Sequence, residues 1–294
     1  MTIAIIGTGN MGGAIMRGLI KSGTCRPEEI ICTAKTKATL DRIREFDDHI
    51  RVSQDNAAAA AQADIIILAV KPWLVEEVME EIRPSLRKEK QMIVSVAAGV
   101  TLNRLAAMAE APSPWADAKG ASVATTADLS APRSSSNQLL DGERPPFVIF
   151  RVVPNTAVEA LCGVTFIASH GATDEQAGQI HQLFSALGYA LIVDEKLIPA
   201  GTSLASCGIA FAMRYIRAAM EGGVELGFRP EEAARIVEHT VKGAATLLLE
   251  SGAHPEAEID KVTTAGGITI KGLNAMERAG FTAAVIDGLK ATNL

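Results

Sequence analysis

The chain has 294 residues, of which 48% are hydrophobic and 21% charged, which predicts a globular protein of one or two domains and excludes a disordered one. Its formal net charge of -6 gives no indication of nucleic-acid binding. The four cysteines form no C-x-x-C pair and the five histidines stand far apart, so we expect a reducing compartment, thiols that mostly fill the core, and no metal site.

The N-terminus leads directly into a short apolar run, with no basic segment before it. No apolar run approaches the length that spans a membrane. We therefore expect a cytoplasmic protein without a signal peptide.

The first stretch, TIAIIGTGNMGGAIMRGL, predicts a buried strand over residues 3–6 and a helix over about 11–22. Between them lies a G-x-G-x-x-G motif of Gly7, Gly9 and Gly12. We expect Gly7 to allow the tight turn, Gly9 to let the backbone approach a pyrophosphate, and Gly12 to let the helix pack on the strand. The motif in this context predicts a dinucleotide site. The alternative is an ordinary glycine-rich turn.

The second predicted strand shows which dinucleotide is expected. NAD enzymes usually carry an acidic residue near the end of this strand, where it binds the ribose 2'-hydroxyl. Here Thr33 and Ala34 occupy that place, and Lys35 and Lys37 follow. Two cations without a carboxylate favour a 2'-phosphate, so we predict NADP rather than NAD. The alternative is that both lysines are only solvated loop charges.

Further apolar runs predict more strands, at about 63–72, 91–95, 147–154, 163–169 and 189–195. Helices are expected between them, one of them with Thr101 as its N-cap. This alternation predicts a doubly wound, mostly parallel sheet of the Rossmann type, in which ligands bind beyond the carboxyl ends of the strands. Lys71, Pro72 and Ala98 fall at those ends.

Residues 111–146 interrupt this pattern. They are rich in Ala, Ser, Pro, Asp and Gly and show no helical or strand period. We expect an irregular surface insertion in the first domain. A functional lid is the alternative.

After about residue 195 the pattern becomes helical, and two long helices are expected, the second opened by Pro230 with Glu231 and Glu232 in its first turn. We therefore divide the chain into an NADP-binding domain at 1–195 and an all-helical domain at 196–294. The wide apolar faces of the helices predict dimerisation. The alternative is burial against the first domain of the same chain.

The segment HPEAEIDKVTTAGGITIKGLNAMERAGF, residues 254–281, predicts two helices joined by a loop. The loop carries Gly266 and Gly267, flanked by the hydroxyls of Thr264 and Thr269. Amides at a helix N-terminus bind a carboxylate well, so we predict a substrate-carboxylate site. The alternative, a simple turn between helices, is expected to need only one glycine.

Taken together, the segments GTGNMGGAI, AVKP, SVAAGVTL, RVVPNTAV, GGVELG and residues 254–281 resemble the pyrroline-5-carboxylate reductase family. The resemblance covers nearly the whole chain outside 111–146. It implies a Rossmann domain, a helical substrate-binding and dimerisation domain, and NAD(P)H-dependent reduction of Δ1-pyrroline-5-carboxylate to L-proline, the last step of proline biosynthesis.

The resemblance and the motifs together assign candidate site residues. The residues expected at the cofactor are Gly7, Gly9, Asn10, Met11, Gly12, Thr33, Lys35, Lys37, Asn56, Lys71, Pro72 and Ala98. The residues expected at the substrate are Thr264, Gly266, Gly267 and Thr269. Two departures from the family pattern stand out, because Ala265 and Ile209 replace prolines.

The chemistry expected at this site is hydride addition to the carbon of a cyclic imine. The resemblance places Thr269 at the hydroxyl that contacts the ring nitrogen, and the reaction needs no catalytic histidine. One alternative is another NADP-dependent imine or β-hydroxyacid reductase, with Lys242 as the candidate acid. The other alternative is a non-catalytic, NADP-binding dimer.

Overall fold

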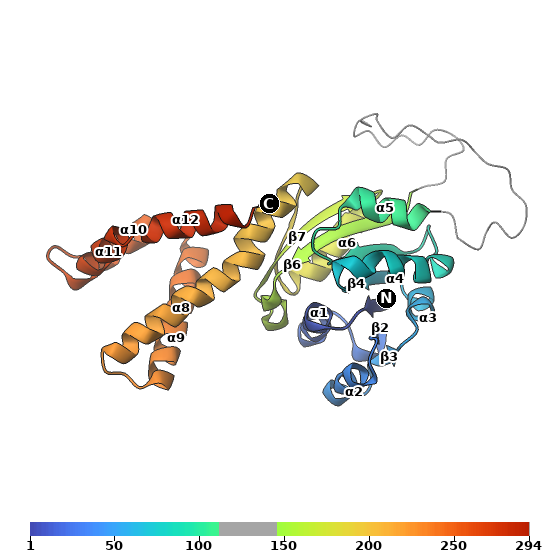
Figure 1. The fold of residues 1–294 in the computed structure, drawn as a ribbon, viewed down its shortest axis with the longest axis horizontal. Coiled ribbons are helices and arrows are strands. Elements are labelled where there is room, and N and C mark those ends of the chain that lie inside the picture. Colours follow the sequence, from blue (N-terminus) through green and yellow to red (C-terminus); the bar gives the residue numbers. More distant parts are fainter. Residues whose placement is uncertain (112–145, 294) are drawn as a thin grey trace, which may run out of the picture. The chain divides into compact units, whose positions relative to one another are not determined.

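The computed structural model describes residues 1–111 and 146–293. The predicted insertion therefore lies outside the described residues, except for its end residues Ala111 and Pro146. The chain forms two compact units, Met1–Ile198 and Pro199–Leu294, and the blue-to-yellow ribbon of Figure 1 shows the sheet of the first unit.

The first unit is built on one eight-stranded sheet with the order β3-β2-β1-β4-β5-β6-β7-β8. All neighbouring strands are parallel except β6 and β7, which pair in opposite directions. The prediction of a doubly wound, mostly parallel sheet is thus confirmed. The strands are β1 Ile3–Ile6, β2 Ile30–Thr33, β3 Arg51–Ser53, β4 Ile65–Leu68, β5 Met92–Ser95, β6 Val148–Pro154, β7 Gly163–His170 and β8 Gly188–Ile192.

Strand β3 was not predicted. It has only three residues, Arg51, Val52 and Ser53, at the edge of the sheet, and none of them is buried. Because an edge strand shares little of the core, it needs no apolar run, and its sequence carries no strand pattern. Its omission matters because Asn56 directly follows it.

Helices cover both faces of the sheet. Side chains of α1, α2 and α6 pack with alternate strand residues in one apolar cluster. Helix α4 contacts α3 and α5, α3 contacts β1 and β2, and α5 contacts β6 and β7. Thr101 caps α5 as predicted, since its hydroxyl accepts a bond from Arg104 N at 3.3 Å. The helices are α1 Asn10–Lys21, α2 Lys37–Phe46, α3 Asn56–Gln62, α4 Val75–Ile82, α5 Leu102–Glu110 and α6 Asp174–Ser185.

The first unit ends with the short 3-10 helix η6, Glu195–Leu197, which side-chain bonds tie to the sheet. The Glu195 carboxylate accepts from Arg151 Nη1 and from Leu102 N, both at 2.8 Å. These bonds fix the start of the helical region against β6 and α5.

The second unit is helical throughout its described part. The two predicted long helices are confirmed, and α9 begins at Pro230 with Glu231 and Glu232 in its first turn. A π-helical turn, Thr202–Cys207, precedes α8 and was not predicted. The helices are α7 Ile198–Gly201, α8 Gly208–Glu225, α9 Pro230–Ser251, α10 Pro255–Val262, α11 Ile268–Arg278 and α12 Phe281–Ala291.

Very few residues of this helical unit are buried. Among residues 199–293 only Gly201, Ser203 and Ala233 are classed as buried. The helical stretch Glu195–Glu225 is long and apolar enough to cross a membrane by length and composition, and 22% of its most apolar window is buried. One such helix is weak evidence for a membrane segment.

The cysteines are all free. Cys25 and Cys32 fill the core as expected, and burial raises the pKa of Cys25 to about 11 and that of Cys32 to about 12. Cys162 is exposed, so the expectation of a core thiol is wrong for this residue.

Candidate functional site

The residues expected at the cofactor come together at one edge of the sheet. They follow the carboxyl ends of β1, β2, β3, β4 and β5, which are neighbouring parallel strands. Because parallel strands end at the same edge, five loops distant in sequence form one rim. This rim is the part of the first unit that we consider as a ligand site.

The turn after β1 has the backbone that its glycines predict. Gly7 has φ +91°, which L side chains rarely adopt, and a Cβ there would lie 2.5 Å from Val70 Cγ1. A Cβ on Gly12 would lie 2.6 Å from Gly7 O and 3.1 Å from Ala69 Cβ. Gly7 therefore permits the turn, and Gly12 lets α1 approach the strands.

Gly9 differs from the other two glycines, because a Cβ there would meet no atom within 4 Å. Its missing side chain leaves the N-terminus of α1 uncovered. No side chain caps this helix end, and the described residues offer no recorded acceptor for the backbone N–H groups of Asn10, Met11 and Gly12. Such amides at a helix start are well suited to an anionic ligand.

The same turn is anchored to the end of β2 through one carbonyl. Thr33 O accepts from Gly7 N at 3.1 Å, Thr8 N at 2.8 Å and Thr8 Oγ1 at 3.1 Å. The glycine-rich turn and the segment that follows β2 therefore hold each other in place.

Lys35 and Lys37 lie on that segment, and both are exposed. Neither takes part in an ion pair recorded among the described residues. Thr36 between them caps α2, so Lys37 is the first residue of that helix. Both cations are thus free to meet an anion at this rim.

Thr33 and Asn56 are linked by their side chains. The Thr33 side chain is fully buried, and its hydroxyl donates to Asn56 Oδ1 at 2.6 Å. Asn56 Nδ2 in turn donates to Glu81 Oε2 at 2.7 Å. The hydroxyl of Thr33 therefore positions Asn56, and Glu81, on α4, is a partner of this rim residue that sequence reasoning missed. No spacing rule connects residues 25 positions apart, so the sequence carried no signal for it.

The remaining predicted residues lie at the next two strand ends. Lys71 is exposed and caps a short 3-10 helix, Pro72–Leu74, that begins with Pro72. Ala98 is exposed beyond β5. Trp73, which follows Lys71 and Pro72, has 75% of its surface exposed, which is unusual for an indole ring.

The predicted substrate loop lies in the second unit, between α10 and α11. Gly267 N donates to Thr264 O at 2.9 Å, and Gly266 has φ +72°, the pattern of a type II turn. A Cβ on Gly267 would lie 2.7 Å from Thr264 Oγ1. The turn itself thus requires both glycines, so the expectation that a simple turn needs only one is wrong, and the glycine pair alone does not indicate a ligand.

The two threonines of the loop are exposed. The N-cap of α11 is Gly267 rather than Thr269, and no hydrogen bond of the Thr269 hydroxyl is recorded with the described residues. Thr269 therefore does not cap the helix, and its hydroxyl is available to a ligand.

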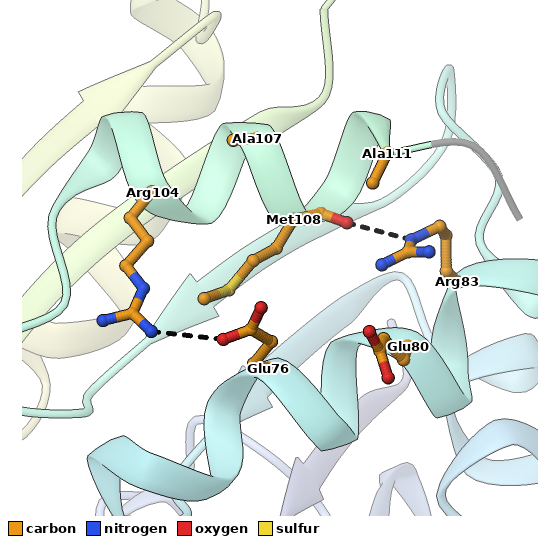
Figure 2. A pocket seen from close by; sticks show the side chains of 7 residues that line it. All are labelled: Glu76, Glu80, Arg83, Arg104, Ala107, Met108 and Ala111. Carbon is orange, nitrogen blue, oxygen red and sulfur yellow. Dashed lines mark hydrogen bonds and ion pairs between the residues drawn. The ribbon is translucent and has the colours of Figure 1, made fainter. Parts of the chain in front are cut away.

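Two other features of the first unit lie apart from the predicted residues. A hollow of about 330 Å³ lies between α4 and α5. Arg104 pairs with Glu76 there at 3.2 Å, and Arg83 Nε donates to Met108 O at 2.9 Å (Figure 2). After α2, half-buried Asp47 and exposed Asp48 and His49 have ligand atoms close together. Hydrogen bonding to Asp47 and the charges of both carboxylates raise the pKa of His49.

Two family models match the chain. Residues 2–99 match "NADP oxidoreductase coenzyme F420-dependent", and residues 195–294 match "Pyrroline-5-carboxylate reductase dimerisation". The second match begins where the helical region begins and covers the poorly buried unit.

Full-length relatives agree with these models. A pyrroline-5-carboxylate reductase of Methanosarcina acetivorans is 34% identical, over 98% of this chain and 93% of the relative. Pyrroline-5-carboxylate reductase 1 of Dictyostelium discoideum is also 34% identical over 98% of this chain, which spans 48% of that longer relative. The solved structure of a pyrroline-5-carboxylate reductase from Coxiella burnetii is 27% identical, with a TM-score of 0.79 and coverage of 99% of this chain and 95% of that chain.

Proposed function

Because the chain belongs to the pyrroline-5-carboxylate reductase family, we propose that it reduces Δ1-pyrroline-5-carboxylate to L-proline with NADPH, the last step of proline biosynthesis. The observation that carries this proposal is the combination of two elements in one chain. One is the glycine-rich turn with unpaired amides in Met1–Ile198, and the other is the exposed loop with free threonine hydroxyls within the segment matched to the reductase dimerisation model.

The first unit fits a dinucleotide. A bound NADPH would supply the hydride for the reaction. The amides of Asn10, Met11 and Gly12 would hold its pyrophosphate, because Gly9 leaves that helix end uncovered. Lys35 and Lys37 would hold the 2'-phosphate, and Asn56, Lys71, Pro72 and Ala98 would line the remaining rim.

The loop of the second unit would bind the imino acid. In this proposal the amides of Gly266 and of the first turn of α11, with the Thr264 hydroxyl, hold the substrate carboxylate, since Gly267 N is already bonded to Thr264 O. The Thr269 hydroxyl donates a hydrogen bond to the ring nitrogen as the imine becomes an amine. A protonated imine accepts hydride readily, so orientation of the ring contributes more than a strong acid.

Self-association is part of the proposal. The match to a dimerisation model accounts for the exposed apolar residues of α8 to α12, so we expect them to contact a second copy of the chain. The same contact would cover the apolar stretch Glu195–Glu225. On this basis we propose a cytoplasmic homodimer or a larger assembly of dimers.

The direct test is oxidation of NADPH, followed at 340 nm, upon addition of Δ1-pyrroline-5-carboxylate, with proline identified as the product. The comparison reaction is oxidation of a β-hydroxyacid with NADP⁺, followed by the formation of NADPH, because Lys242 is exposed on α9 and is the acid that the β-hydroxyacid alternative requires. Turnover of the hydroxyacid alone would favour the alternative. Binding of NADPH without turnover of either substrate would indicate a non-catalytic protein.

The cofactor preference has its own test in Lys35→Glu. This change should weaken NADPH binding far more than NADH binding, because only NADPH carries the 2'-phosphate. Equal losses for the two cofactors would contradict the assignment of Lys35 to that phosphate.

A further inference from the structure

A carboxylate is missing after β2, but another element, α4, supplies one that is bonded to Asn56. We propose that Glu81, on α4, is a specificity-determining residue that moderates the preference for NADPH and keeps NADH usable. This inference rests on the proposed dinucleotide site. The sequence motifs assign no role to Glu81.

The first support is geometric. Glu81 Oε2 accepts from Asn56 Nδ2 at 2.7 Å, and Asn56 Oδ1 accepts from the buried hydroxyl of Thr33 at 2.6 Å. Thr33 also anchors the glycine-rich turn through its carbonyl. The Glu81 carboxylate therefore belongs to a chain of bonds that starts at the end of β2, where an acidic residue would contact the adenosine ribose.

The second support is the fixed orientation of Asn56. Both polar atoms of its side-chain amide have partners, and these partners lie on different elements, β2 and α4. The amide oxygen must face the Thr33 donor and the amide nitrogen must face the Glu81 acceptor. Glu81 thereby helps to fix the orientation of the Asn56 amide.

The third support is charge. Glu81 is exposed, and no cation pairs with it among the described residues. The segments that follow β2 and β3 lie side by side, because Gln54 Nε2 donates to Lys35 O at 2.8 Å and Ala34 N to Ser53 O at 3.4 Å. The two free lysines follow β2 and the unpaired carboxylate is bonded to Asn56, which follows β3, so opposite charges are tied to these two adjacent segments.

These charges act in opposite directions on the two cofactors. Lys35 and Lys37 attract a 2'-phosphate. Glu81 repels that phosphate but accepts a hydrogen bond from a 2'-hydroxyl, the group that NADH carries in its place. The ratio of the two affinities would then follow from the balance between the lysines and Glu81.

The test compares Glu81→Gln with Glu80→Gln in the full-length protein. Glutamine at 81 still accepts from Asn56 but carries no charge. Glu80 is the neighbouring residue on α4 and borders the hollow of Figure 2, so its replacement removes the same charge from a different face of the helix. Calorimetry measures the Kd of NADPH and of NADH for each protein at low and high salt, and melting temperatures check folding.

We expect Glu81→Gln to raise the affinity ratio of NADPH over NADH by about two- to fivefold at low salt, the range of an exposed charge interaction. The shift should shrink at high salt, because screening weakens the repulsion that is removed. Glu80→Gln should leave the ratio unchanged. Glu81→Ala should also weaken NADH binding, because Asn56 loses its partner.

Several results would overturn the inference. A folded Glu81→Gln variant with an unchanged ratio would do so, and so would an equal shift in Glu80→Gln. If the unmodified chain reduces the imine and only the ratio fails to respond, the inference alone is wrong. If the unmodified chain binds neither cofactor, the inference and the proposed function fail together.

Discussion

The two units of the molecule treat their apolar side chains in opposite ways. In the first unit, every residue of β1, β2, β4 and β5 is buried. In the second, residues 199–293 bury only Gly201, Ser203 and Ala233, although its helices carry many leucine, isoleucine and phenylalanine residues. Apolar content alone therefore does not establish an internal core, and the second unit needs another surface to cover its helices.

The largest effect is expected from charging the exposed apolar face of the second unit. Ile236 and Leu247 lie on one face of α9, eleven residues apart, and are 48% and 57% exposed. Changing both to Asp should dissociate the assembly, because burying one such side chain stabilises by about 1.5–3 kcal/mol. Light scattering should then give the single-chain mass of 30.9 kDa.

The control places one such charge on the first unit. Tyr189 is 63% exposed on β8, and Tyr189→Asp should leave the assembly intact. An unmodified chain that is a stable monomer at micromolar concentration would contradict the role given to the helical faces.

The next largest effect is expected from removing a threonine hydroxyl that has no recorded partner in the described part of the chain. Thr33 is fully bonded at its strand end, whereas the Thr269 hydroxyl has no recorded partner among the described residues. Thr269→Val keeps the shape and removes the donor, so kcat/KM should fall. Loss of one transition-state donor costs about 2.7–4 kcal/mol, and we expect the lower end or less because the imine can arrive protonated.

A threonine whose hydroxyl is already satisfied provides the control for this change. Thr240 on α9 donates to Ile236 O at 2.8 Å, so Thr240→Val should leave kcat/KM unchanged. Affinity for NADPH should be unaffected in both variants. Full activity of Thr269→Val would exclude a catalytic role for this hydroxyl.

The glycines of the first unit separate folding from binding. Gly12→Ala should lower the free energy of unfolding by about 1–3 kcal/mol, because the new methyl group overpacks against Gly7 O. Gly9→Ala meets open space, so it should leave the melting temperature unchanged while weakening NADPH binding. Denaturant titration and calorimetry measure the two effects. Equal stability losses would show that Gly9 is also needed for packing.

These residues also show how far the sequence could predict the molecule. Buried parallel strands have continuous apolar runs, and helix starts have caps, so the main sheet and the long helices were predictable. The exposed strand β3 and the π-helical turn carry no such pattern. The contact between Asn56 and Glu81 depends on how α3 and α4 pack, which no local spacing encodes. The pair Gly266 and Gly267 predicted a ligand site, but the turn conformation itself accounts for both glycines.

A smaller change should sharpen the comparison within the second unit. Ala265 occupies the second position of the type II turn, where proline is favoured. Ala265→Pro should raise the free energy of unfolding by about 0.4–1 kcal/mol, because it restricts the unfolded chain. Thermal denaturation at fixed protein concentration measures this gain, with Ala253→Pro as a comparison in which the lost N–H was bonded to Ser251 Oγ. A loss at 265 would contradict the turn geometry.

The smallest effect is expected on the surface of the first unit. Arg17 donates to both carboxylate oxygens of Glu159, at 2.8 and 2.9 Å. These hydrogen bonds, with the charges of Arg17 and Lys21, hold the pKa of Glu159 below its usual 4.5. Glu159→Gln should cost about 0.2–1 kcal/mol at neutral pH, since the pair is exposed.

The pH dependence of this pair follows from the sign of the shift. The stabilisation is present above the carboxyl's usual pKa and is lost as the pH falls through its lowered folded value. The unfolding free energies of the variant and the unmodified chain should therefore converge in acid. A difference that persists below the lowered pKa would contradict an ionic origin.

The anchoring of the glycine-rich turn to the carbonyl of Thr33 bears on which substitutions the proposed coenzyme site can accept. The glycine-rich turn is anchored to a main-chain atom, which every residue type provides, whereas the groups expected to distinguish the two cofactors are side chains at 35, 37 and 81. Substitutions at those three positions leave the anchor in place. If these side chains set the coenzyme preference as proposed, that preference would change one surface substitution at a time, while the glycine-rich turn proposed to hold the pyrophosphate keeps its anchor.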